Sequence, residues 1–277
     1  MRAVHPICVT CGVQFAETER TPAVCPVCAD ERQFVGWAGQ RWTTLEALRG
    51  GHRLAVRDEG DGLLGIGCEP RFAIGQRALL VPAKPQDGPG RHLLWDCISL
   101  IDDAAVRLVE AAGGLGGIAI SHPHFYGAMV EWSRAFGGAP IWLHVDDRDW
   151  VMRPDPAIRF WEGERLELGP GLTLLRLGGH FPGGQVLHWA DAAGGRGALL
   201  SGDIVQVVQD RRYVSFMRSY PNFIPLPAAA VRRIAERLEP VPFERIYGGW
   251  FDLVVREDGK AALRRSAERY LRALEHA

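Results

Sequence analysis

Three short apolar segments of this chain each end in a glycine- or proline-rich loop that carries a potential metal ligand. The segments and ligands are residues 118–121 before His122 and His124, residues 174–179 before His180, and residues 198–202 before Asp203. Layered α/β folds gather functional side chains on loops held at the ends of sheet strands. The pattern therefore predicts a fold of strands and helices with a metal site at one edge of a sheet.

The rest of the chain alternates strand-like and helix-like segments, which indicates an α/β layered domain. Further strands are expected at 62–68, 78–81, 92–97, 140–145, 166–168, 172–177, 185–189 and 244–247. Helices are expected at 102–112, 125–136, 227–238 and 261–274. Asp102 and Asp103 suit the start of the first helix, and the glycines after residue 112 suit its end.

The spacing of the histidines favours one shared ion. His122 and His124 are separated by one residue, so both can reach a single metal when their loop curves. A third imidazole from His180 and the carboxylate of Asp203 complete four ligands suited to zinc or iron. A lone histidine, such as His188 in an alternating strand, is more often packed or hydrogen-bonded. Three strand-end histidines with a strand-end aspartate favour a metal centre.

The order His-x-His, Gly-Gly-His-x-Pro-Gly and Ser-Gly-Asp resembles the metallo-β-lactamase superfamily, from about residue 63 to the C-terminus. The resemblance implies a four-layer αββα sandwich of the α/β (α+β) class, with metal at one edge of the sheets. It implies that His122, His124 and His180 bind the first metal and that Asp203 replaces the aspartate bridging two metals. Asp96 stands where the family has a strand-end aspartate.

The chain also departs from the family pattern at the second metal. The family's first motif is usually His-x-His-x-Asp-His, but Tyr126 stands in place of the aspartate and Gly127 in place of the second histidine. Near the C-terminus the family often has Gly-His after a strand, whereas this chain has Gly249-Trp250. Three ligands of the second site are missing, so one catalytic metal is expected, with Trp250 filling the vacated space.

These residues predict a metallo-hydrolase that uses a single metal-bound hydroxide on a small ester-, thioester- or lactam-like substrate. Asp203 would be a fourth ligand or the base that orients the water, and Tyr126 would donate a hydrogen bond to a developing oxyanion. Zn²⁺ is the expected catalytic metal rather than Fe²⁺.

Two alternatives remain open. Two histidines and Asp203 would form a facial triad for non-haem iron, similar to the mononuclear iron of some persulfide dioxygenases of this superfamily. An eroded metal site would instead mark a non-catalytic binding protein.

Four cysteines in two Cys-x-x-Cys pairs precede this domain: Cys8, Cys11, Cys25 and Cys28. Four thiolates close a tetrahedral shell, which favours a structural zinc over a redox pair or a chance cluster. We therefore expect a zinc-ribbon-like module at residues 1–34 and a metallo-β-lactamase-like catalytic domain at residues 35–277.

Two other loops carry weaker signals. His144 and Asp146-Asp147 follow an apolar segment, where a strand-end turn is favoured over an additional ligand. The stretch from Arg218 to Asn222 fits either a pocket wall or a proline-directed turn.

Charge and hydropathy limit the partners. With 32 basic and 33 acidic residues the formal net charge is −1, which disfavours general nucleic-acid binding. No apolar run of membrane-spanning length or signal-peptide type occurs, so a cytoplasmic protein acting on a small molecule is expected. The sequence leaves the oligomeric state open.

Overall fold

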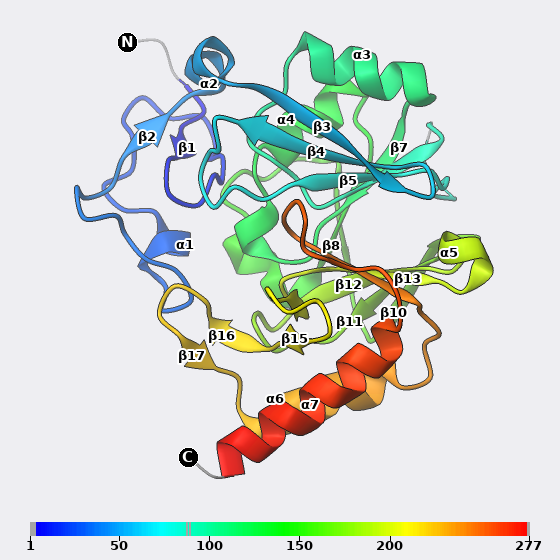
Figure 1. The fold of residues 1–277 in the computed structure, drawn as a ribbon. Helices are drawn as coiled ribbons and strands as arrows, with labels where there is room; N and C mark the ends of the chain where they lie inside the picture. Colours follow the sequence, from blue (N-terminus) through cyan, green and yellow to red (C-terminus); the bar gives the residue numbers. More distant parts are fainter. Residues whose placement is uncertain (1–3, 87, 89, 276–277) are drawn as a thin grey trace.

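Two β-sheets face each other in the computed structural model, which describes residues 4–86, 88 and 90–275 (Figure 1). The first sheet has seven strands in the order β3 (Arg53–Gly60), β4 (Leu63–Glu69), β5 (Ala78–Val81), β6 (His92–Trp95), β7 (Leu115–Ala119), β8 (Ile141–His144) and β9 (Ile158–Trp161). The second has six, in the order β10 (Arg165–Gly169), β11 (Leu172–Arg176), β12 (Gln185–Trp189), β13 (Ala198–Gly202), β18 (Arg245–Gly248) and β19 (Val254–Val255).

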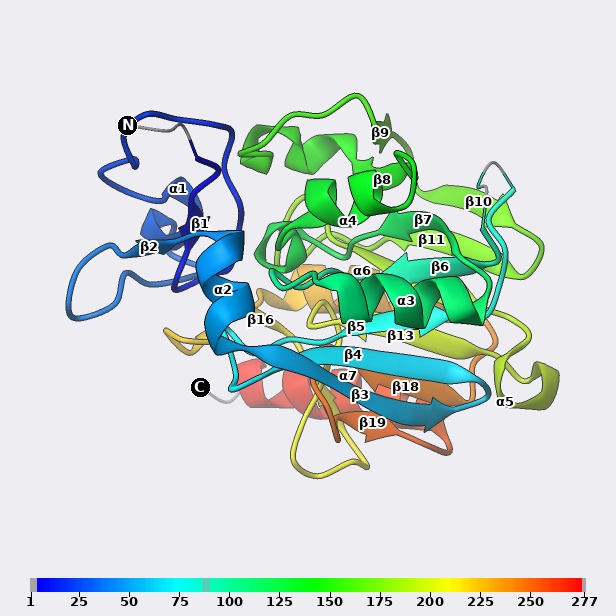
Figure 2. The ribbon, with the colours of Figure 1, turned by 90° about the horizontal axis from the view of Figure 1, so that it is seen from above.

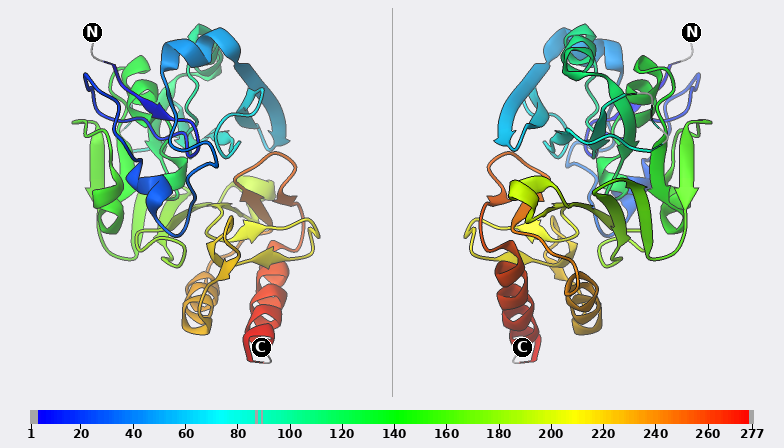
Figure 3. Two further views of the ribbon diagram at one scale, coloured as in Figure 1. Left: turned by 90° about the vertical axis from the view of Figure 1, so that its left-hand side faces the viewer. Right: turned by 90° about the vertical axis from the view of Figure 1, so that its right-hand side faces the viewer.

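Helices cover the outer face of each sheet. Above the first sheet lie α3 (Asp103–Ala112) and α4 (Met129–Ala135), and below the second lie α6 (Ala228–Leu238) and α7 (Gly259–Glu275) (Figure 1). Figure 3 shows α6 and α7 side by side beneath the second sheet. The four layers are the αββα sandwich that the family resemblance implied, so that prediction is confirmed.

Three apolar clusters hold the layers together. One joins α3 and α4 to the first sheet through side chains such as Val109, Trp132 and Ile118. Another lies between the sheets, and a third packs α6 and α7 against the second sheet. Because both faces of each central strand are buried, these strands are apolar runs rather than alternating ones.

Most predicted elements lie within a few residues of their observed bounds, but the segment after His124 differs. A helix was expected over 125–136, whereas the structure has a 3₁₀ turn at Pro123–Phe125 and α4 begins only at Met129. Gly127 has φ +48°, and this left-handed conformation interrupts the helix. The turn matters because it places His124 and Phe125 inside the molecule.

The N-terminal segment forms a small unit at one end of the sheets (Figure 2). It contains β1 (Ile7–Cys8), α1 (Pro26–Ala29) and β2 (Trp42–Thr43), and β1 pairs with β2. The helix α2 (Leu45–Gly51) then leads into β3. The predicted domain boundary after residue 34 stays a prediction.

The remaining elements lie near the site edge or in connecting loops. They are η2 (Val145–Trp150), α5 (Ala192–Gly195), β14 (Gln206–Val207), β15 (Val214–Ser215), β16 (Met217–Ser219) and β17 (Ile224–Pro225). None of the helices that the structure describes is long and apolar enough to cross a membrane.

Candidate metal centre

The three strand-end histidines and Asp203 meet at one edge of the sandwich. His122 and His124 follow β7, His180 follows β11, and Asp203 directly follows β13. His124 Nδ1 lies 3.1 Å from His180 Nε2, and His122 Nε2 lies 3.2 Å from Asp203 Oδ1. One nitrogen from each imidazole lies within 4.8 Å of the other two. The loops thus bring together the four side chains that the sequence placed at strand ends.

Burial sets the protonation of these groups. The exposed fractions are 1% for His122, 3% for His124, 1% for His180 and 4% for Asp203. Burial lowers the pKa of all three imidazoles, that of His180 to about 4, so at neutral pH they are in the uncharged form that binds metal. Burial and then the nearby Asp96 raise the pKa of Asp203 well above its usual range.

These side chains fit a metal ion. His122 Nε2 and Asp203 Oδ1 are fully buried, and within the described ranges neither has a hydrogen-bond partner. Buried polar atoms without partners are costly, and an ion between them would satisfy both. Imidazole nitrogens with one carboxylate oxygen are a donor set suited to Zn²⁺.

Neighbouring groups orient the histidines. His180 Nδ1 donates to the carbonyl of Met217 at 3.2 Å, so in the neutral ring the lone pair of Nε2 faces the centre. Ser121 Oγ lies 3.0 Å from His122 Nδ1, and the Ser121 N–H donates to Asp96 Oδ1 at 2.7 Å. Asp96, the strand-end aspartate expected from the resemblance, therefore anchors the start of the first histidine loop.

Gly127 stands where the family resemblance expects a second-metal ligand, and Gly249 directly precedes Trp250, which stands at another such position; neither glycine leaves space for a side chain. A Cβ on Gly127 would lie 2.7 Å from the backbone carbon of Ile98, and one on Gly249 would lie 2.5 Å from the Phe125 ring. The buried Phe125 ring stands 4.9 Å from that of His122, and Trp250 packs behind it at 5.6 Å. Phe125 therefore lies between His122 and Gly249, with Trp250, the expected filler, as a second layer.

Tyr126 and Asp147 form a second buried polar group beside the histidine loops. Burial raises the pKa of Tyr126 well above its usual range, and the Asp147 carboxylate adds to this shift. Asp147 Oδ1 accepts a hydrogen bond from the Gly183 N–H at 2.8 Å. Burial raises the pKa of Asp147 to about 7.

We expect Asp147→Asn to flatten the pH dependence of stability. The carboxyl titrates at about 7 in the fold against an ordinary 3.8, so the folded state holds its proton more tightly. Its stabilising contribution is therefore fully present below about pH 4 and is lost as the pH rises to about 7. Asparagine keeps the acceptor for Gly183, so the variant should be the more stable protein at about pH 8, by at most on the order of 4 kcal/mol. Urea unfolding of both proteins across this pH range measures the difference. If the free energies of unfolding of the two proteins change with pH in parallel, the expectation is wrong.

A residue that sequence reasoning missed lies against the same loops. Arg32, from the cysteine-rich segment, is 6% exposed, and its Nη1 donates to the His180 carbonyl at 3.4 Å. Its guanidinium carbon lies 3.9 Å from the Phe181 ring centroid and 5.1 Å from that of Trp150. Nothing in the spacing of the sequence links Arg32 to a loop 148 residues away.

The four predicted cysteines also converge. Cys8 Sγ lies 3.5 Å from Cys28 Sγ, and Cys11 Sγ lies 3.7 Å from Cys25 Sγ. All four sulfur atoms lie within 4.8 Å of one another, and all four residues are buried. Burial raises the pKa of Cys11 well above its usual range, whereas hydrogen bonds from the other thiols lower that of Cys8. Four thiols at this separation form a closed set that a metal cation would stabilise as thiolates.

Comparison with known proteins agrees with this geometry. The fold matches the DIM-1 metallo-β-lactamase with a TM-score of 0.58 and 14% identity, covering 80% of this chain and 98% of that one. It matches VMB-1 with a TM-score of 0.56 and 12% identity over 80% and 98% of the two chains. A B3 metallo-β-lactamase with an active-site glutamic acid gives 0.52 and 17% over 81% and 90%. No family model matches the chain.

Fold and site together define a protein of the metallo-β-lactamase fold that carries a His₃ cluster and an N-terminal Cys₄ cluster, as the sequence predicted. At the level of sequence the chain is 48% identical over 270 residues to the uncharacterized protein YmaE of Bacillus subtilis (strain 168), covering 97% of this chain and 96% of that protein. It belongs to the same family as YmaE.

Proposed function

We propose that this chain is a metal-dependent hydrolase with a mononuclear centre held by His122, His124 and His180, acting on a small ester-, thioester- or lactam-like substrate. One observation carries the proposal: three neutral imidazoles converge on one point, with Asp203 Oδ1 3.2 Å from His122 Nε2, while the Phe125 ring fills the adjoining space toward Gly249. A site that has ligands for one metal ion and no room for a second set of ligands favours hydrolysis supported by a single ion.

The residues around the centre have separate roles in this proposal. A Zn²⁺ held there would act as a Lewis acid that polarises a carbonyl and lowers the pKa of its water to about 7. Ser121 and the Met217 carbonyl keep the two imidazoles of His122 and His180 oriented. Asp203, 3.2 Å from His122 Nε2, either completes the ligand set or accepts the proton of the attacking water.

Tyr126 is the proposed donor to the oxyanion. Because its pKa is raised well above its usual range, its phenol keeps the proton at neutral pH and is a hydrogen-bond donor. A carbonyl oxygen that gains negative charge beside this hydroxyl would accept its hydrogen bond. Substitution by phenylalanine would remove the donor while keeping the ring.

Elemental analysis of the purified protein tests the metal centre. We expect two zinc ions per chain, falling to one in a His122→Ala/His180→Ala variant. A His188→Ala variant is the matched control, because His188 lies in β12 and its Nε2 contacts the Pro242 carbonyl instead of the centre.

Other results would change the assignment. One zinc and one iron, with only the iron lost from the double variant, would indicate oxygen chemistry of the facial-triad type. A single zinc that the double variant retains would show that the histidine cluster holds no metal and would favour a binding protein.

A further inference from the structure

A four-residue segment of the cysteine-rich unit, residues 30–33, lies against the histidine centre. We call it the cover segment. It leaves α1, whose C-terminal cap is Asp30, and Asp30 Oδ2 accepts a hydrogen bond from Arg32 Nη2 at 2.9 Å. Arg32 in turn packs on Phe181 and contacts the His180 carbonyl. The segment therefore contacts the loop that carries one of the three imidazoles.

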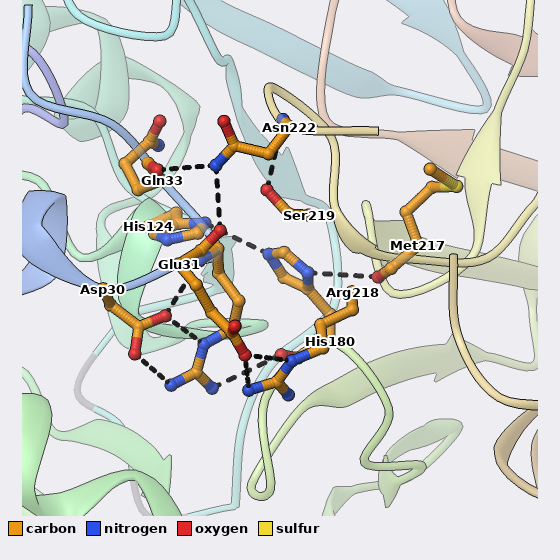
Figure 4. Close-up of polar contacts among 10 residues, drawn as sticks. Asp30, Glu31, Gln33, His124, His180, Met217, Arg218, Ser219 and Asn222 are labelled. Carbon is orange, nitrogen blue, oxygen red and sulfur yellow. Dashed lines mark hydrogen bonds and ion pairs between the residues drawn. The ribbon is translucent and has the colours of Figure 1, made fainter. Parts of the chain in front are cut away.

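The far side of the cover segment is fastened to β16 and the loop after it. Arg218 Nε donates to Glu31 Oε1 at 2.6 Å. Asn222 Nδ2 donates to the carbonyls of Glu31 at 2.9 Å and Gln33 at 3.0 Å (Figure 4). Arg218 and Asn222 thus tie the cover segment to a chain segment far from it in sequence, and we call these contacts the latch.

The segment that carries the latch also holds the site. The Met217 carbonyl orients His180, and the Tyr220 hydroxyl donates to the Asp203 carbonyl at 2.8 Å. The cover segment and the latch residues accordingly enclose the centre from two sides, and the four converging side chains are at most 4% exposed. In this arrangement a substrate molecule has no exposed imidazole to approach.

We propose that residues 30–33 are a movable cover over the histidine centre, and that the latch must open before a metal ion or a small substrate enters or leaves. The inference rests on the proposed function, because it takes the three imidazoles as the metal-binding group. The Cys₄ cluster anchors one end of the cover segment, and the latch holds the other.

The composition of the latch fits repeated opening. The side chains of Glu31 and Arg218 are 58% and 38% exposed, so water competes for both charges. Asn222 donates to backbone carbonyls that water reaches once the segment lifts. The apolar contact between the cover segment and the histidine centre comes mainly from Arg32, whose guanidinium packs on the rings of Phe181 and Trp150. This buried contact favours the closed position of the segment.

Metal extraction measures the opening directly. The full-length protein is loaded with Co²⁺, and release from the histidine centre into excess chelator is followed by the cobalt absorption spectrum. We expect an Arg218→Gln/Asn222→Ala variant to release this cobalt about tenfold faster, since it loses the latch hydrogen bonds. Arg264→Gln is the matched control, because it breaks an ion pair of similar exposure with Glu239 far from the site and should release cobalt at the wild-type rate. Equal rates of cobalt release from the wild type, the latch variant and Arg264→Gln would contradict the proposal of a movable cover.

A separate readout distinguishes failure of the cover from failure of the metal centre. If the wild-type histidine cluster takes up no cobalt, the proposed function fails, and the cover is tested by carbethoxylation of His122, His124 and His180 with diethyl pyrocarbonate, followed by peptide mass spectrometry. Faster labelling in the latch variant than in Arg264→Gln supports the cover. Equal labelling of these three buried histidines overturns it.

Discussion

Replacing Cys8 by serine is expected to release the metal of the N-terminal unit and to unfold residues around it. Cys8 Sγ lies 3.5 Å from Cys28 Sγ and accepts a hydrogen bond from Gln40 Nε2 at 3.2 Å. A serine hydroxyl does not ionise at neutral pH, so the variant offers three thiolates and one poor ligand. Because β1 and α1 have only 2 and 4 residues, the unit has little regular secondary structure of its own to keep its shape without the metal.

The expected effect is large. Binding of a structural zinc supplies about 10–16 kcal/mol in small zinc-folded peptides, comparable to the whole stability of a typical domain of about 5–15 kcal/mol. The cysteines also belong to the same apolar cluster as Ile66 of β4 and Ile118 of β7, so the loss reaches the first sheet. Thermal unfolding and the zinc content of the variant measure this loss of stability. We expect the midpoint temperature of the first unfolding transition to fall by more than about ten degrees, which corresponds to a loss on the order of several kcal/mol.

Cys97→Ser is the control for burying a hydroxyl. Cys97 is fully buried but lies outside the four-cysteine cluster, where its thiol faces the Ile98 carbonyl. This variant should keep its zinc and lose little stability. A Cys8→Ser protein that melts like Cys97→Ser with its full metal content would show that the cluster is not a metal site.

Local sequence patterns were sufficient for two of the three strands that precede the candidate ligands. Strands β11 and β13 were predicted to within two residues, because each is a short apolar run that begins after a glycine. Strand β7 begins at Leu115, three residues before the predicted start, because Gly116 and Gly117 interrupt its apolar pattern. Strand β3 was not anticipated, since it is largely exposed and contains Arg53, Arg57 and Asp58, which carry no apolar pattern. Strand β9 was missed for a similar reason, because its apolar run is interrupted by Arg159.

The clustering of the three histidines was predictable, whereas their surroundings were not. His122 and His124 lie in one short motif, His180 in a second and Asp203 in a third. The Phe125 ring beside Gly249 depends on how β7 and β18 lie in space, which no local pattern records. The contacts of Arg32 with Phe181 and of Asn222 with Glu31 join segments about 150 to 190 residues apart, so they depend on the docking of the N-terminal unit.

Asp203→Asn is expected to weaken metal binding at the histidine centre and to abolish most hydrolysis. Burial and the nearby Asp96 raise the pKa of Asp203 well above its usual range, so without metal the site favours the protonated, uncharged carboxyl. Asparagine then replaces it without a change of charge, and the metal-free proteins should unfold alike. With a metal present, the wild-type carboxyl would lose its proton and either bind the ion or orient the attacking water. The amide of asparagine does both poorly. We expect about 10- to 100-fold weaker metal affinity and about 10²- to 10⁴-fold slower hydrolysis.

Chelator competition for Zn²⁺ and turnover of a chromogenic ester, thioester or lactam measure the two effects separately. Asp210→Asn serves as the control, because this exposed carboxylate pairs with Arg212 on the surface. Loss of hydrolysis with metal affinity unchanged would assign Asp203 to proton transfer, while equal loss of both would make it a ligand. A variant that keeps both would remove Asp203 from the mechanism, and the buried Oδ1 beside His122 Nε2 would then need a different partner.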